Sequence, residues 1–188
     1  MTITAVYDAC VFYPAALRDL LMHIASAGLC RARWTEEIHD EWISALLKNR
    51  PDLKPGALAV TRELINNSVR DAVVTHYRSL IPRLSLPDSD DRHVLAAAIK
   101  AKAEVIVTTN LADFPAKALT PYGIVAEHPD VFVMRLMAQD KPAVIAAVRR
   151  QRKNLKRPAK TPEQLLASLH KLHMKKTVAV LRQHIDEI

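Results

Sequence analysis

The sequence has 188 residues, 49% of them hydrophobic and 25% charged, which allows one domain with a proper core and a small appendage. No apolar run approaches the roughly 20 residues that a membrane-spanning helix needs, and the spacing of Cys10 and Cys30 matches no zinc-binding pattern. The opening stretch, MTITAVYDACVFYP, has neither the basic region nor the cleavage site of a signal peptide. We therefore expect a cytoplasmic protein with reduced thiols and no membrane association.

Positive charge is concentrated near the C-terminus. The formal net charge is +7, and residues 141–188 hold 12 Lys or Arg against 3 Asp or Glu, whereas residues 1–140 are slightly acidic. Such a segment is typical of contact with a polyanion or an acidic partner, although a solvated helical face would have the same composition. We expect the chain to divide into residues 1–140 and a basic, helical extension, residues 141–188.

The first half of the chain predicts one strand and several helices. Ile3 to Tyr7 is a short β-branched run that predicts a buried strand. Helical spacing of leucines follows over 15–27, with Gly28 as a C-cap, and Thr35 is placed to cap the next helix. After the interruption at Pro51 and Pro55, two more helical segments are expected at about 57–67 and 70–80, then a short strand at 83–86.

The second half repeats the alternation of strands and helices. A helix is expected from Asp90 to about Lys102, a buried strand over 105–108, a third strand over 124–126 and a helix beginning at Val131. Residues 149–162 form an expected basic connector, after which Thr161 and Gln164 provide a capping box for a further helix. This alternation predicts an α/β fold with a mainly parallel central sheet.

Acidic residues stand at places where a parallel sheet would bring them together. Asp8 ends the first strand, Glu41 borders the apolar stripe of its helix, Asp91 opens a helix and Asp113 follows the second strand. Taken singly, each could be a cap, a turn residue or a surface side chain. Together, they would form an oxygen-rich site for a hard divalent cation, because functional groups gather beyond the carboxyl ends of parallel strands.

Four motifs in order resemble those of PIN-domain ribonucleases, and among these the VapC-type toxins of bacterial toxin–antitoxin pairs. They are VYDACV (residues 6–11), WTEEIHDEW (34–42), DDRHVLAAA (90–98) and VTTNLADF (107–114). The resemblance implies a PIN-like α/β/α fold for residues 1–140, with four acidic residues around a Mg²⁺ or Mn²⁺ ion. It also implies an endoribonuclease that hydrolyses RNA phosphodiester bonds with water as the nucleophile.

Carried over by position, the resemblance assigns the acids individually. Asp8, Glu41 and Asp91 are the expected catalytic residues and metal ligands, and Asp90 is ranked below Asp91. At the fourth position many relatives have aspartate where this chain has Asn110. Either Asn110 is a neutral ligand or Asp113 supplies the catalytic charge through a water. Thr108 or Thr109 could hydrogen-bond a metal-bound water.

The resemblance also implies partners: a structured RNA such as transfer or ribosomal RNA, a cognate antitoxin and a second copy of the chain in a homodimer. The residues expected to bind RNA are Arg92, Arg149, Arg150, Arg152, Lys153, Lys156 and Arg157. An alternative is a catalytically inactive PIN-like RNA-binding module, which Asn110 keeps open. An aspartyl-phosphate phosphatase is disfavoured, because Cys10 stands where a second aspartate would be needed.

Overall fold

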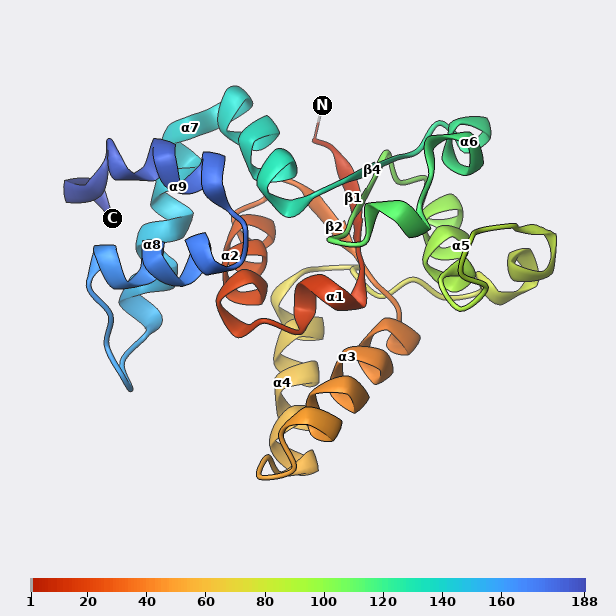
Figure 1. Ribbon diagram of the computed structural model, residues 1–188, viewed down its shortest axis with the longest axis horizontal. Helices are drawn as coiled ribbons and strands as arrows, with labels where there is room; N and C mark the ends of the chain where they lie inside the picture. The colour runs from red at the N-terminus through yellow and green to blue at the C-terminus, as the bar shows by residue number, and fades with distance from the viewer. Residues whose placement is uncertain (1) are drawn as a thin grey trace.

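The computed structural model describes residues 2–188 and has a four-stranded, wholly parallel sheet at its centre (Figure 1). The strands are β1 (Thr4–Tyr7), β2 (Arg31–Arg33), β3 (Val105–Val107) and β4 (Val125–Glu127), in the order β2-β1-β3-β4. β1 lies between β2 and β3, with Ala5 opposite Ala32 and Val105. Because all four strands run the same way, the loops after β1 and β3 meet at one edge of the sheet.

Helices flank the sheet and complete a PIN-like α/β/α fold. The helices preceding β4 are α1 (Ala9–Phe12), α2 (Ala15–Ser26), α3 (Glu36–Asn49), α4 (Pro55–Ser68), α5 (Arg92–Lys100) and α6 (Ala116–Leu119). Short 3₁₀ turns are η1 (Arg78–Arg83), η2 (Leu111–Asp113) and η3 (Thr120–Tyr122). The side chain of Thr35 accepts a hydrogen bond from the Ile38 amide and so fixes the start of α3, the helix that carries Glu41.

An aromatic cluster lies directly under the end of β1. The ring of Tyr7 lies 6.1 Å from Phe12 and 6.2 Å from Phe132, and Phe12 meets Trp34 edge-on at 5.6 Å. All four side chains are buried. The cluster joins β1, α1 and the start of the C-terminal helices. Its packing holds the end of β1, and therefore the adjoining Asp8, in place.

The C-terminal region is helical and packs beside α2 (Figure 1). It comprises α7 (Pro129–Asn154), α8 (Pro162–Lys171), α9 (Lys175–Arg182) and η4 (Ile185–Glu187). α7 is kinked at Asp140, whose φ is −152° and whose carboxylate accepts from the Ala143 amide. Asp130 is buried and accepts from the amides of Lys176 and Thr177, so a residue at the start of α7 caps the start of α9.

Most of the expected elements are present, including the capping box of Thr161 and Gln164. The helix expected over 70–80 is wrong: Asp71 and His76 have positive φ, and the chain between them is extended. Trp34 pairs there with Val73 as a parallel bridge, so pairing with a distant residue replaces the local helix. The strand expected over 83–86 is also wrong, since Arg83 ends η1 and residues 84–86 have no regular structure.

Two further differences concern elements that the apolar pattern does not mark. β2 was not anticipated, because its sequence Arg-Ala-Arg has one buried residue between two arginines. The basic connector expected over 149–162 is too long, since α7 continues to Asn154 and the link to α8 covers only residues 155–161. Within residues 2–188, no helix is both long and apolar enough to cross a bilayer.

Candidate active site

Asp8 is the buried centre of the candidate site and lies at the end of β1. Its carboxylate accepts from the Ala9 amide at 2.6 Å, from the Thr108 hydroxyl at 2.7 Å and from the Cys10 thiol at 3.1 Å. Only 4% of the residue is exposed. Burial, followed by the charge of Asp8, raises the pKa of Cys10 to about 11, which keeps the thiol protonated and able to donate. Asp8 is therefore held by donors from α1 and from the loop after β3.

Asp91 lies close to the other acidic residues of the candidate site. It precedes α5, but its side chain makes no capping hydrogen bond, so helix capping does not explain it. Burial first, and then the charges of Asp8, Asp113, Asp88 and Glu41, raise the pKa of Asp91 to about 6. A mutual effect of this kind requires the carboxylates to lie near one another. The structure thus gathers the acids that the sequence places on four separate segments.

Glu41 faces α5 across the site. Its Oε1 lies 2.6 Å from Nε2 of His93, and its side chain is 40% exposed whereas that of His93 is 4% exposed. Burial would lower the pKa of His93, but Glu41, then Glu37 and Asp8, raise it above its ordinary value. His93 is not among the site residues expected from the sequence, because nothing in the local pattern reveals a contact between two helices.

A cavity of about 330 Å³ adjoins the Glu41 side of the site. It is mostly apolar and is lined by Ala9, Cys10, Tyr13, Glu41, Trp42 and Ala45. Cys10 thus lies between the cavity and Asp8, and it also accepts from the Thr109 amide at 3.2 Å. From the sequence, Cys10 was expected to be a reduced thiol and argued against a phosphatase, but its contact with Asp8 was not anticipated.

The loop after β3 supplies the remaining candidates. Thr108 is buried, donates to Asp8 and accepts from the Asn110 amide at 3.0 Å. Its hydroxyl is therefore used within the protein. Asn110 is exposed, whereas Asp113 in η2 is half-buried and is one of the charges that raise the pKa of Asp91. Of the two, Asp113 adds negative charge to the site.

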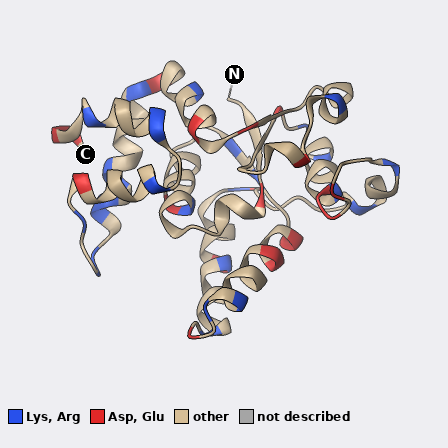
Figure 2. Ribbon diagram, in the orientation of Figure 1, with Lys and Arg blue, Asp and Glu red and all other residues tan. Residues whose placement is uncertain are grey.

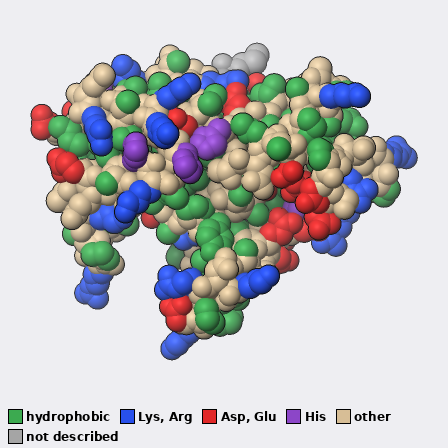
Figure 3. Space-filling view, in the orientation of Figure 1, with side chains coloured by type: hydrophobic (Ala, Val, Ile, Leu, Met, Phe, Trp, Pro, Cys, Tyr) green, Lys and Arg blue, Asp and Glu red, His purple; other side chains and the backbone are tan. Residues whose placement is uncertain are grey.

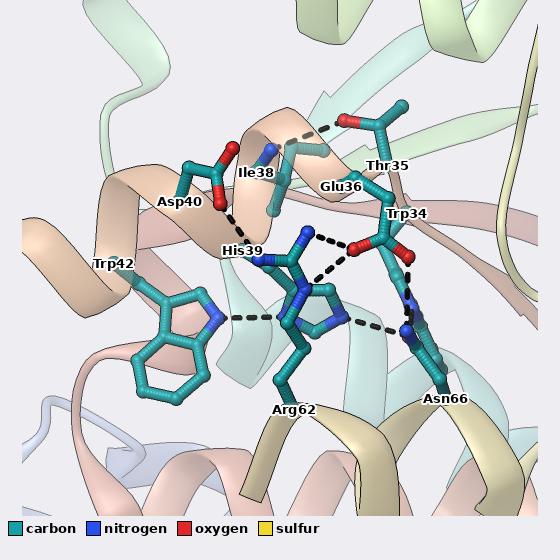
Figure 4. A network of polar contacts seen from close by, with 9 residues as sticks. All are labelled: Trp34, Thr35, Glu36, Ile38, His39, Asp40, Trp42, Arg62 and Asn66. Atoms are coloured by element: carbon teal, nitrogen blue, oxygen red, sulfur yellow. Dashed lines mark hydrogen bonds and ion pairs between the residues drawn. The ribbon is translucent and has the colours of Figure 1, made fainter. Parts of the chain in front are cut away.

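A polar network anchors the helix that carries Glu41 (Figure 4). Asn66 Oδ1 accepts from the Trp34 indole at 2.7 Å and lies 2.9 Å from Nε2 of His39. The Trp42 indole donates to Nδ1 of the same ring at 2.9 Å, and Asn66 donates to Glu36 at 3.0 Å. Around this network, Arg62 on α4 pairs with Glu36 and Asp40 on α3. α3 is thus held to α4 through His39 and through the acids Glu36 and Asp40.

The donor atoms suit a hard divalent cation, because they are carboxylate oxygens whose mutual repulsion already raises one pKa. Over residues 2–188, however, no three His, Cys, Asp or Glu side chains are arranged closely enough to hold one ion. Asp8 instead uses its oxygens on neighbouring donors, and Glu41 contacts His93. The acids form a concentrated negative region rather than a closed coordination shell.

Acidic side chains collect between the start of α3 and the loop before α5 (Figures 2 and 3). The charged residues of the C-terminal helices are instead mostly Lys and Arg (Figure 2). Three of the expected RNA-binding arginines are engaged within the protein. Arg149 donates to the Glu187 carbonyl, and Arg152 donates to that of Ile188 at 3.0 Å. Arg92 donates to the Ser89 carbonyl at 2.9 Å. The remaining candidates are exposed: Arg150, Lys153, Lys156 and Arg157.

Comparison with known families decides which family the chain belongs to. Residues 4–112, more than half of the chain, match the PIN domain family. The chain belongs to the PIN-domain family. Residues 129–183 of this PIN protein match a second family, the VapC50 C-terminal domain, so both regions correspond to a VapC-type toxin.

One relative among curated proteins matches part of this PIN protein. It is named "Putative ribonuclease VapC50", from Mycobacterium tuberculosis (strain ATCC 25618 / H37Rv), and is 38% identical over 112 residues. The match covers 58% of this chain and 56% of the relative, so the chain spans little more than half of that protein's length. No solved structure matches the chain.

Proposed function

We propose that this PIN protein is a Mg²⁺- or Mn²⁺-dependent endoribonuclease and the toxin of a toxin–antitoxin pair. What supports the proposal is that, after burial, the charges of Asp8, Asp113 and Glu41 raise the pKa of Asp91, which requires these carboxylates to lie near one another. The name of the matched relative supports an RNA substrate. Two free thiols, Cys10 and Cys30, suit action in the reducing cytoplasm.

In this proposal Asp8, Glu41 and Asp91 would contribute ligands to the cation, with Asn110 as a neutral ligand and waters completing its shell. When bound, the cation supplies Lewis acidity at the phosphodiester and a water of lowered pKa. Asp8 is kept in place by Thr108 and Cys10, so its position is fixed before a ligand arrives. Asp113 adds the fourth negative charge, and one of the carboxylates accepts the proton of the attacking water.

The same proposal assigns the rest of the molecule. Residues 1–140 form the nuclease domain, and residues 141–188 form the basic extension, in which Arg150, Lys153, Lys156 and Arg157 contact phosphates of a structured RNA. Arg149 and Arg152 support the extension by binding the last carbonyls of the chain. The antitoxin covers the acidic region, and the toxin is a homodimer, which sedimentation of the purified protein would test.

The test is cleavage of total cellular RNA by purified protein with Mg²⁺, Mn²⁺ or EDTA. Discrete products that disappear with EDTA and in both Asp8→Asn and Asp91→Asn are expected. Asp90→Asn is the matched control, because Asp90 is exposed and lies beside Asp91; it should retain activity. Products that persist in Asp8→Asn and Asp91→Asn would refute this site.

The inactive RNA-binding module is the second candidate, and Asn110 at the fourth acidic position favours it. RNA binding without cleavage under all metal conditions would establish it. Divalent-ion affinity separates the two candidates independently, because a binding module has no need of a metal pocket.

A further inference from the structure

His93 occupies a buried position next to the acidic site. It lies on α5 two residues after Asp91, and 4% of its side chain is exposed. Nε2 lies 2.6 Å from Oε1 of Glu41, although the ring N–H is not aligned for a directed hydrogen bond. The contact is therefore a close polar or ionic pair between α5 and α3.

Packing does not explain an imidazole at this position. Among the described residues, Nδ1 of His93 has no hydrogen-bond partner, and leaving a buried polar atom unpaired lowers stability. Its neighbours Val94, Leu95 and Ala98 on the same helix are fully buried and apolar. An aliphatic residue would fill the space without that loss, so the gain from histidine must come from the Nε2 side.

The contact joins two helices that otherwise share little surface. Each helix carries one of the acids, Glu41 on α3 and Asp91 near the start of α5. One turn earlier on α3, Glu37 is held by the Tyr77 hydroxyl at 2.7 Å. Within residues 2–188, no hydroxyl or amide group holds Glu41 in this way. Because 40% of its side chain is exposed, Glu41 would be free to turn toward solvent without His93.

We infer that His93 is a positioning residue, which holds the Glu41 carboxylate beside α5 and thereby sets its spacing from Asp91. The inference rests on the proposed metal site. Residues that orient metal ligands commonly change metal affinity by about 10- to 100-fold when they are replaced. The effect should therefore appear in cation binding by the full-length protein, without any measurement of RNA cleavage.

Two amide substitutions separate orientation from polarity. The side-chain nitrogen of His93→Gln lies about where Nε2 was and can still reach Glu41, whereas that of His93→Asn ends near the place of Nδ1 and cannot. Mn²⁺ affinity is measured by electron paramagnetic resonance of the free ion. We expect His93→Gln to stay within about threefold of the parent and His93→Asn to bind about 10- to 100-fold more weakly.

A double variant tests whether the effect passes through Glu41. In a Glu41→Gln background, adding His93→Asn should change Mn²⁺ affinity by less than about twofold, since the group it positions is already altered. Parent-like affinity in His93→Asn, equal losses in both amide variants, or a full additional loss in the double variant would each overturn the inference. Failure of the parent to bind Mn²⁺ in an Asp8-dependent way would instead refute the proposed metal site, and the inference with it.

Discussion

Removing the Asn66 side chain should destabilise the protein far more than removing that of its neighbour. Asn66 Oδ1 accepts from the Trp34 indole and from His39, and both of these side chains are completely buried. An indole nitrogen can only donate, so the bond from Trp42 makes Nδ1 of His39 an acceptor and places the ring proton on Nε2. Asn66→Ala therefore leaves two buried N–H donors without an acceptor.

The magnitude follows from those two donors. A buried donor left unpaired costs about 1–3 kcal/mol, so two of them cost about 2–6 kcal/mol. Because Asn66 itself is half-buried, water can enter and replace part of the loss. We expect the lower half of the range, about 3 kcal/mol.

Urea unfolding followed by circular dichroism measures the free energy of unfolding without depending on the tryptophans near the mutation. Asn67→Ala is the matched control, since Asn67 is exposed on the same helix and should change stability by no more than about 0.5 kcal/mol. If the free energies of unfolding of Asn66→Ala and Asn67→Ala differ by less than about 0.5 kcal/mol, the network does not anchor α3.

Three further predictions follow from other contacts. Burial lowers the pKa of His39, so below pH about 6.5 the unfolded chain binds more protons than the folded chain. The free energy of unfolding should therefore fall as the pH decreases from 7 to 5. His39→Gln should flatten this pH dependence in urea titrations. Gly123 has a positive φ of +68° and open space around it, so Gly123→Ala should lower stability by about 1–2 kcal/mol through backbone strain. Gly56→Ala, within α4, should be neutral or stabilising. Equal effects of the two substitutions would show that the positive φ is not the cause. Thr108→Val removes the hydroxyl that donates to the Asp8 carboxylate and should weaken Mn²⁺ binding about tenfold or more. Thr109→Val, at an exposed position, should leave Mn²⁺ binding unchanged. Equal Mn²⁺ affinities of the two variants would contradict this role of Thr108.

Local patterns predicted the parts of the site that depend on chain order. The apolar run before Asp8 and the helix after Asp91 are marked by periodicity, and parallel strands necessarily bring their carboxyl ends together. The parallel β-bridge between Trp34 and Val73 has no local sequence pattern, because it depends on a partner far along the chain. The contact between Glu41 and His93 depends on how two helices are oriented, which residue spacing within either helix does not encode.

The contacts of the basic residues in the C-terminal region are likewise not encoded in the local sequence. Composition predicts that the segment is basic, and exposure of Arg150 and Lys153 agrees with a surface role. Composition cannot distinguish these from Arg149 and Arg152, which bind carbonyls at the end of the chain. That distinction arises only when η4 folds back onto α7.

The hydrogen bond between Thr108 and Asp8 joins residues separated by 100 positions in the chain. A ribosome adding about 5–20 residues per second needs roughly 5–20 s to synthesise that interval. Until then β1 lacks β3, the neighbour that separates it from β4 in the finished sheet. A nascent chain that has not reached Thr108 therefore contains no assembled acidic site, and the order of synthesis itself delays whatever chemistry the site performs.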